Sequence, residues 1–161
     1  MRILGIDPGL RITGYGCIER GGAGEEILIE AGVVRLRPGD SLPRRLCELE
    51  ADLCALIERL SPDMVCVEKL YSHYRHPTTA ITMGHARGVT LLVAERAGVG
   101  VSELGATEVK KSLTGNGHAG KAQMQDSVRA QLGLAAAPSP PDVADAIAIA
   151  LCAVRRCEAA R

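Results

Sequence analysis

Four acidic side chains occupy positions where an isolated carboxylate would be costly. Asp7 ends the apolar segment RILGID, and Glu68 ends a second apolar segment, MVCVE. A carboxylate that finishes an apolar strand needs a hydrogen bond, a basic partner or a metal ion. Asp142 and Asp145 stand three residues apart in PDVADAIAIAL, which predicts that both project from the same side of one helix.

Together, these four carboxylates predict metal chemistry. Without cations they would repel one another and shift each other's pKa values. Their hard oxygen atoms suit Mg²⁺ or Mn²⁺, which retain several waters and share phosphate oxygens with a substrate. Two such ions about 4 Å apart can activate water and stabilise the leaving oxygen in phosphodiester cleavage. We therefore expect a metal-dependent nuclease that uses Mg²⁺, accepts Mn²⁺ instead, and holds two ions when substrate is bound.

Each acid taken alone has a simpler explanation. Asp7 precedes a Pro-Gly pair, where aspartate commonly forms a turn. Glu68 could form an ion pair at the end of its strand with Lys69 or Arg87. Asp142 and Asp145 could each cap their helix or interact with the helix dipole, an explanation that is stronger for Asp142 because it follows two prolines. The metal-site hypothesis is favoured because acids from three distant segments are all predicted at the same end of one sheet.

The segment GNGHAGKA, residues 115–122, fits the first seven positions of the phosphate-binding pattern G-x-x-x-x-G-K. The full pattern requires Ser or Thr after the lysine to bind the Mg²⁺ of the nucleotide, and Ala122 offers no ligand atom. A phosphate loop should also follow a buried apolar strand, whereas the preceding segment TEVKKSLT is polar. The sequence therefore disfavours an ATP-binding loop.

Hydrophobic periodicity predicts the five strands and four helices that position these side chains. Their order, βββαβαβαα, indicates an α/β fold with a mixed sheet flanked by helices. Short connections between the first three strands favour an antiparallel meander. Sites in open α/β sheets form beyond the carboxyl ends of strands, where Asp7 and Glu68 are expected. The strands are predicted near residues 2–7, 13–20, 26–36, 62–70 and 99–104, and the helices near residues 42–60, 77–97, 120–132 and 142–157.

Length and composition are those of one ordinary globular domain. Of 161 residues, 47% are apolar and 24% are charged, and we expect residues 1–161 to form a single domain. The six cysteines form no C-x-x-C pair, which favours a reducing compartment. The sequence contains neither a signal peptide nor an apolar stretch of about 18 residues, so we expect a soluble, cytoplasmic protein with no membrane contact.

The formal net charge is zero, but the charges are unevenly distributed. Between residues 69 and 121, seven Lys or Arg stand against three Glu, and all four histidines fall there. Between residues 19 and 63, ten acids stand against six bases. A basic middle third suggests one surface that faces a polyanion, although charges scattered over solvated faces would give the same count.

Several motifs, taken in order and spacing, resemble the RuvC family of Holliday-junction resolvases. They are GIDPGLRITGYGCIE, VCVEKLY, GHARGV, VKKSLTGNGHAGKAQM and PDVADAIAIAL, and the similarity covers nearly the whole chain. The resemblance implies an RNase H-like fold and a structure-selective endonuclease that cuts two strands of like polarity at a four-way DNA junction in recombination and repair. It also implies a homodimer and contact with the RuvAB branch-migration complex.

The resemblance assigns roles to individual residues. Tyr71 matches an aromatic position thought to stack on a base near the cut, where many members of the family have Phe. Lys110 and Lys121 match basic positions near the substrate phosphates, and His118 and Arg75 are further expected DNA contacts. The matching catalytic and metal-binding acids are Asp7, Glu68, Asp142 and Asp145.

A homodimer also fits the symmetry of the expected substrate. A roughly two-fold junction needs two symmetric incisions, and one chain carries one acid cluster, so a two-fold dimer supplies the second. The helix predicted at residues 77–97 is the candidate interface, because Gly84 and Gly88 would let another backbone approach closely. Ordinary packing of this helix onto the sheet is the alternative.

Three other functions remain open. The first is a nuclease of the same fold acting on structured RNA. The second is a phosphotransferase of the actin and sugar-kinase type, although that architecture needs two such domains. The third is a DNA-binding module without catalysis, which the four acids disfavour because carboxylates facing phosphate weaken binding unless metals neutralise them.

Overall fold

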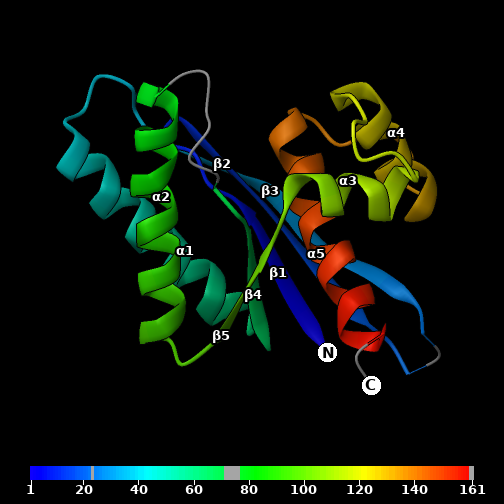
Figure 1. The fold of residues 1–161 in the computed structure, drawn as a ribbon. Helices are drawn as coiled ribbons and strands as arrows, with labels where there is room; N and C mark the ends of the chain where they lie inside the picture. Colours follow the sequence, from blue (N-terminus) through cyan, green and yellow to red (C-terminus); the bar gives the residue numbers. More distant parts are fainter. Residues whose placement is uncertain (23, 71–76, 160–161) are drawn as a thin grey trace.

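The computed structural model describes residues 1–22, 24–70 and 77–159 (Figure 1). All five predicted strands and four predicted helices are present, and α3 is an additional helix. The elements are β1 (Arg2–Asp7), β2 (Ile12–Arg20), β3 (Glu26–Arg35), α1 (Leu42–Leu60), β4 (Met64–Glu68), α2 (Pro77–Arg96), β5 (Gly100–Leu104), α3 (Ala106–Thr114), α4 (Lys121–Gln131) and α5 (Pro141–Ala159).

The strands form the predicted mixed five-stranded sheet, in the order β3-β2-β1-β4-β5. β1, β2 and β3 pair antiparallel, which confirms the meander, whereas β4 runs parallel to both β1 and β5. Ile6 of β1 pairs with Val67 of β4. The next residue in each strand is an acid, so Asp7 and Glu68 leave the sheet side by side at the same end.

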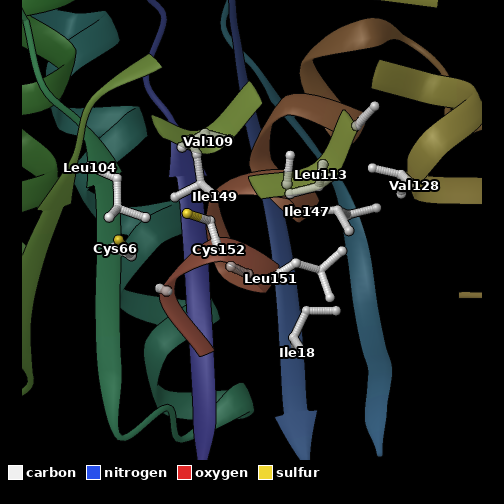
Figure 2. Close-up of a cluster of buried hydrophobic side chains, with 14 of the residues drawn as sticks. Ile18, Cys66, Leu104, Val109, Leu113, Val128, Ile147, Ile149, Leu151 and Cys152 are labelled. Atoms are coloured by element: carbon white, nitrogen blue, oxygen red, sulfur yellow. The ribbon is translucent and has the colours of Figure 1, made fainter. Parts of the chain in front are cut away.

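Helices cover both faces of the sheet (Figure 1): α1 and α2 lie on one face, and α3, α4 and α5 lie on the other. Each interface is filled by aliphatic side chains. In α1 the apolar residues recur every three or four positions and face the sheet. In α5 the buried stretch runs from Val143 to Val154. Figure 2 shows the cluster on the α5 side, where Ile18 of β2 lies near Leu151.

The helix α3 is the element that the sequence analysis missed. It spans nine residues, of which Val109 and Leu113 are buried, so the segment carries a single apolar pair at helical spacing. That pair is too short a repeat to distinguish a helix from a polar loop. Gly105 precedes the helix and Gly115 ends it with φ +73°, a left-handed conformation that favours glycine.

The presence of α3 also bears on the loop at residues 115–120. A nucleotide-binding phosphate loop connects a strand to a helix, whereas this loop connects two helices, α3 and α4. The structural context therefore agrees with the rejection of an ATP-binding loop. None of the helices among the described residues is long and apolar enough to cross a membrane.

Candidate active site

The four predicted acids lie at one end of the sheet, where β1 and β4 end and α5 begins (Figure 1). Asp7 is the last residue of β1 and stands opposite Gly14 of β2. Glu68 is the last residue of β4. Asp142 and Asp145 occupy the first two turns of α5. The structure thus brings together acids from three separate segments of the chain.

The pKa of Asp7 shows how closely these acids interact. The pKa of Asp7 is raised to about 8, mainly by burial and further by the negative charges of Asp145, Glu68 and Asp142, while Lys121 opposes the increase. A carboxyl group with this pKa is mostly protonated at neutral pH when no cation is present. Asp7 is therefore at the electrostatic centre of the cluster.

Glu68 and Asp145 are perturbed in the same direction. Burial is the main cause of the raised pKa of Glu68, Asp145 adds to it, and Lys110 lowers it. Burial also raises the pKa of Asp145, and Asp142 raises it further, whereas Lys121 and Lys110 lower it. Four carboxylates and two lysines therefore act on one another as a single group of charges.

The simpler explanation for Glu68 does not fit the structure. Arg87 forms its ion pair with Glu103 of β5 instead. The backbone N–H of Lys69 donates to the carbonyl of Leu104, and Lys69 has no ion pair with any described residue. Within the described ranges, no Lys, Arg or His forms an ion pair with any of the four acids. Among the described residues, their charges are thus opposed only at longer range, by Lys110 and Lys121.

Three glycines of the sheet allow α5 to carry its acids close to Asp7. A Cβ atom at Gly14 would lie 2.6 Å from the carbonyl carbon of Asp142, and one at Gly16 would lie 2.9 Å from the Cα of Ile147. A Cβ atom at Gly5 would lie 2.7 Å from the backbone nitrogen of Ala150. Any side chain at these positions would push α5 away from β1 and β2. These glycines were not recognised in the sequence as positioning residues, although alternate glycines within a strand are a signal of close backbone approach.

The turn after Asp7 is fixed by Thr13. This threonine is fully buried, and its hydroxyl both donates to the carbonyl of Gly9 (2.7 Å) and accepts from the Gly9 N–H (3.1 Å). Two hydrogen bonds within one short turn hold its backbone relative to β2. The direction in which Asp7 leaves the sheet is therefore defined on both sides, by β4 and by the turn.

The chemistry of the acids fits a hard divalent cation. Their oxygen atoms are the ligands that Mg²⁺ and Mn²⁺ prefer, and the raised pKa values indicate an excess of negative charge that a cation would offset. In the described part of the chain, no three His, Cys, Asp or Glu side chains are grouped closely enough to hold one ion by themselves. Mg²⁺ usually binds through one or two carboxylates, water and substrate phosphate. The donor set can thus hold an ion together with water, and a substrate phosphate would add further ligands.

The predicted basic contacts lie around the carboxylates. Lys110 is half-buried on α3, and Lys121 is the exposed first residue of α4. His118 is exposed in the loop between these helices, where its backbone N–H donates to the side-chain oxygen of Asn116. Both lysines are close enough to lower the pKa of Asp145. Tyr71 and Arg75 lie outside the described residues, so their predicted DNA contacts stay predictions.

Comparisons with known proteins agree with this architecture. The family model for "Crossover junction endodeoxyribonuclease RuvC" matches residues 3–153. The chain is 51% identical over 150 residues to the protein of that name from Rhodopirellula baltica, covering 93% of this chain and 84% of that protein. It is 47% identical over 152 residues to the one from Chloroflexus aggregans, covering 94% and 92%.

A solved structure extends the likeness to three dimensions. The structure of Thermus thermophilus RuvC in complex with Holliday junction substrate has a TM-score of 0.86 and 33% identity to this chain, covering 98% of this chain and 96% of that one. The similarity confirms the predicted RNase H-like α/β fold.

Proposed function

The chain belongs to the RuvC family of crossover junction endodeoxyribonucleases, and we propose that it resolves four-way DNA junctions by metal-dependent hydrolysis of two phosphodiester bonds. The observation that carries the proposal is the convergence of Asp7, Glu68, Asp142 and Asp145 at one end of the sheet. A metal-dependent nuclease is consistent with membership of this family.

The four acids are the proposed metal ligands and catalytic residues. Mg²⁺, with Mn²⁺ as a substitute and two ions when DNA is bound, would supply activated water and stabilise the leaving oxygen. Asp7 gives up its proton when a cation offsets the surrounding negative charge, because that charge and burial are what raise its pKa. Gly14 and Gly16 hold the α5 acids at a fixed distance from β1.

The lysines bind the substrate phosphate in this proposal. Lys121 and Lys110 stand close to the carboxylates on α4 and α3, where a phosphate between metal and lysine would balance both charges. The loop that carries His118 brings Lys121 to the scissile backbone. Tyr71 stacks on a base near the cut, as the family resemblance implies, and Arg75 is a further proposed DNA contact.

We propose that two copies of the chain associate through α2. Ile81 and Leu92 are 62% and 51% exposed and share one side of α2 with Gly84 and Gly88. Apart from the neighbouring backbone of α2 itself, no described atom lies within 4 Å of where a Cβ atom at Gly84 or Gly88 would stand, so no other described element makes the close approach expected there. A two-fold partner seated on this side would place two carboxylate sites on one junction.

Further partners and the compartment follow from the family and the cysteines. RuvAB, the branch-migration complex, is the proposed protein partner. All six cysteines are free, as expected in a reducing compartment such as the cytoplasm, where we propose that the protein works. RNA as the substrate is not favoured, because the named relatives are endodeoxyribonucleases.

A synthetic four-way junction tests the proposed function. Wild-type protein with Mg²⁺ or Mn²⁺ should make paired nicks across the junction, and EDTA should abolish them. Asp7→Asn should lose cleavage while junction binding is retained, because phosphate contacts elsewhere supply most of the affinity. A linear duplex and a structured RNA are the matched substrates. Preferential cleavage of the RNA, or no cleavage of the junction with either ion, would overturn the proposal.

A further inference from the structure

Most arginines of the described residues are already neutralised. Nine of them, on the helices and at the far end of the sheet, form ion pairs, for example Arg96 with Glu50 (2.6 Å) and Arg155 with Glu26 (2.6 Å). The arginines without an ion pair to another described residue all lie in two neighbouring segments, the β1–β2 turn and the stretch from the end of β3 to the beginning of α1. They are Arg11, Arg35, Arg37 and Arg45.

Backbone pairing joins these two segments. Ile12 pairs with Arg35 at the end of the β2–β3 ladder, and the N–H of Leu36 donates to the carbonyl of Arg11 (3.1 Å). Arg45, on α1, donates to the carbonyl of Leu10. Arg45 is therefore occupied in holding the turn, whereas Arg11, Arg35 and Arg37 are exposed. We call these three the arginine surface.

The arginine surface lies at the same end of the sheet as the acids. Arg35 and Arg37 flank Leu36, which is buried with Val34 in the core on the α1 side, so Arg35 projects from the opposite face of β3, the side on which α5 lies. Ile12, the partner of Arg35, is two residues from Gly14, which stands opposite Asp7. The surface is thus reached from the carboxylates by moving across the sheet from β1 toward β3.

A cavity reaches from the acids to Arg11, one member of the arginine surface. It has a volume of about 380 Å³ and lies between the β1–β2 turn and the first turns of α2. Asp142 lines it together with Arg11, and Gly9, Thr78 and Thr82 provide polar or small walls. A strand whose phosphate sits at the acids therefore has an open path to Arg11.

We propose that the arginine surface binds the phosphate backbone of a duplex arm of the junction, on the β2–β3 side of the cut. This inference rests on the proposed function and extends it beyond Lys110 and Lys121, since Lys110 lies on the other side, beside Glu68 of β4. Guanidinium groups that are exposed, free of carboxylate partners and close to a nuclease site match the spaced anionic charges of a DNA backbone. The contact is to phosphate and carries no sequence preference.

Salt dependence of junction binding tests the proposal. All variants are made in the cleavage-inactive Asp7→Asn background, and the dissociation constant is measured between 50 and 200 mM salt. The logarithm of the association constant falls linearly with the logarithm of the salt concentration, and each lost phosphate contact reduces the steepness of that fall by about 0.9. Raising the salt from 50 to 200 mM weakens binding by every variant. For Arg35→Gln/Arg37→Gln this weakening should be about tenfold smaller than for its parent, because two phosphate contacts are lost. Arg11→Gln, which loses one contact, should show about half that change in slope.

The control variant removes the same charge elsewhere. Arg96→Gln/Arg156→Gln replaces two exposed, ion-paired arginines at the distant ends of α2 and α5, and its slope should equal that of the parent. Circular dichroism confirms that each variant is folded. Equal slopes in the parent, the control and both arginine-surface variants would overturn the proposal that the arginine surface binds DNA phosphate. Junction cleavage by the wild-type chain is measured in parallel: its absence would overturn the proposed function itself, whereas cleavage with unchanged slopes would overturn this inference alone.

Discussion

Replacing Gly14 by alanine should separate positioning of the acids from folding of the chain. An added Cβ atom would lie 2.6 Å from the carbonyl carbon of Asp142, whereas ordinary contact begins at 3.4 Å. The first turn of α5 must therefore move by about 1 Å. A misplacement of this size in a catalytic constellation can lower the rate about 100-fold, and crowding of a packed interface costs about 1–3 kcal/mol.

Two measurements on the same protein give the comparison. Single-turnover cleavage of a saturating four-way junction should fall about 100-fold in Gly14→Ala. Urea unfolding should show a loss of about 1–3 kcal/mol in unfolding free energy, which leaves the protein folded. Gly100→Ala is the matched control, because no described atom beyond its two chain neighbours lies within 4 Å of where its Cβ atom would stand. Its cleavage rate should stay near that of the wild type.

The reasoning would be refuted if Gly14→Ala lost stability but cleaved at the wild-type rate. That result would mean that α5 can shift without disturbing the reacting groups, so that the contact between Gly14 and Asp142 would only contribute to packing.

Three further predictions concern charge and assembly. The pKa of Asp7 rises from 3.8 to about 8 on folding, and one pKa unit corresponds to about 1.4 kcal/mol. Asp7→Asn should therefore stabilise the metal-free protein by about 4 kcal/mol at pH 7, measured by urea unfolding in EDTA. A less stable variant would contradict this. The pKa of Asp7 is higher in the folded than in the unfolded state, so its contribution to stability is complete below pH 4 and is lost as pH rises toward 8. The difference in unfolding free energy between wild type and Asp7→Asn should therefore widen from pH 4 to pH 8 in the same assay. A constant difference would be inconsistent with the raised pKa. Ile81→Glu/Leu92→Glu should give monomers in analytical ultracentrifugation, because it places charge in the proposed α2 interface. The control Ile27→Glu changes an exposed residue of β3 and should remain a dimer. An unchanged dimer in the α2 variant would exclude that interface.

The sequence predicted the sheet and the positions of the acids at its end because both depend on local signals. Apolar runs that end in a carboxylate mark Asp7 and Glu68 as strand-end residues, and the structure has β1 and β4 ending there. Regular leucine spacing likewise gave α1 its observed bounds. β1 and β4 are neighbours because they pair in parallel, an arrangement that general rules for α/β sheets anticipate.

Other features depend on packing that no local pattern records. The glycines at 14 and 16 matter because α5, more than 120 residues later, lies against them. The arginine surface was hidden by the acidic balance of residues 19–63, since pairing in three dimensions neutralises some bases and leaves Arg35 and Arg37 free of ion pairs to other described residues. The assignment of residues 1–161 to one domain stays a prediction.

Binding of Mn²⁺ tests the central claim most directly, because it requires neither DNA nor cleavage. The electron paramagnetic resonance signal of free Mn²⁺ should fall when wild-type protein is added. Asp7→Asn/Asp145→Asn should leave the signal nearly unchanged, while Asp126→Asn, which alters an exposed acid of α4, should bind like the wild type. Equal Mn²⁺ binding by the wild type and the double variant would contradict the assignment of these carboxylates to one metal site.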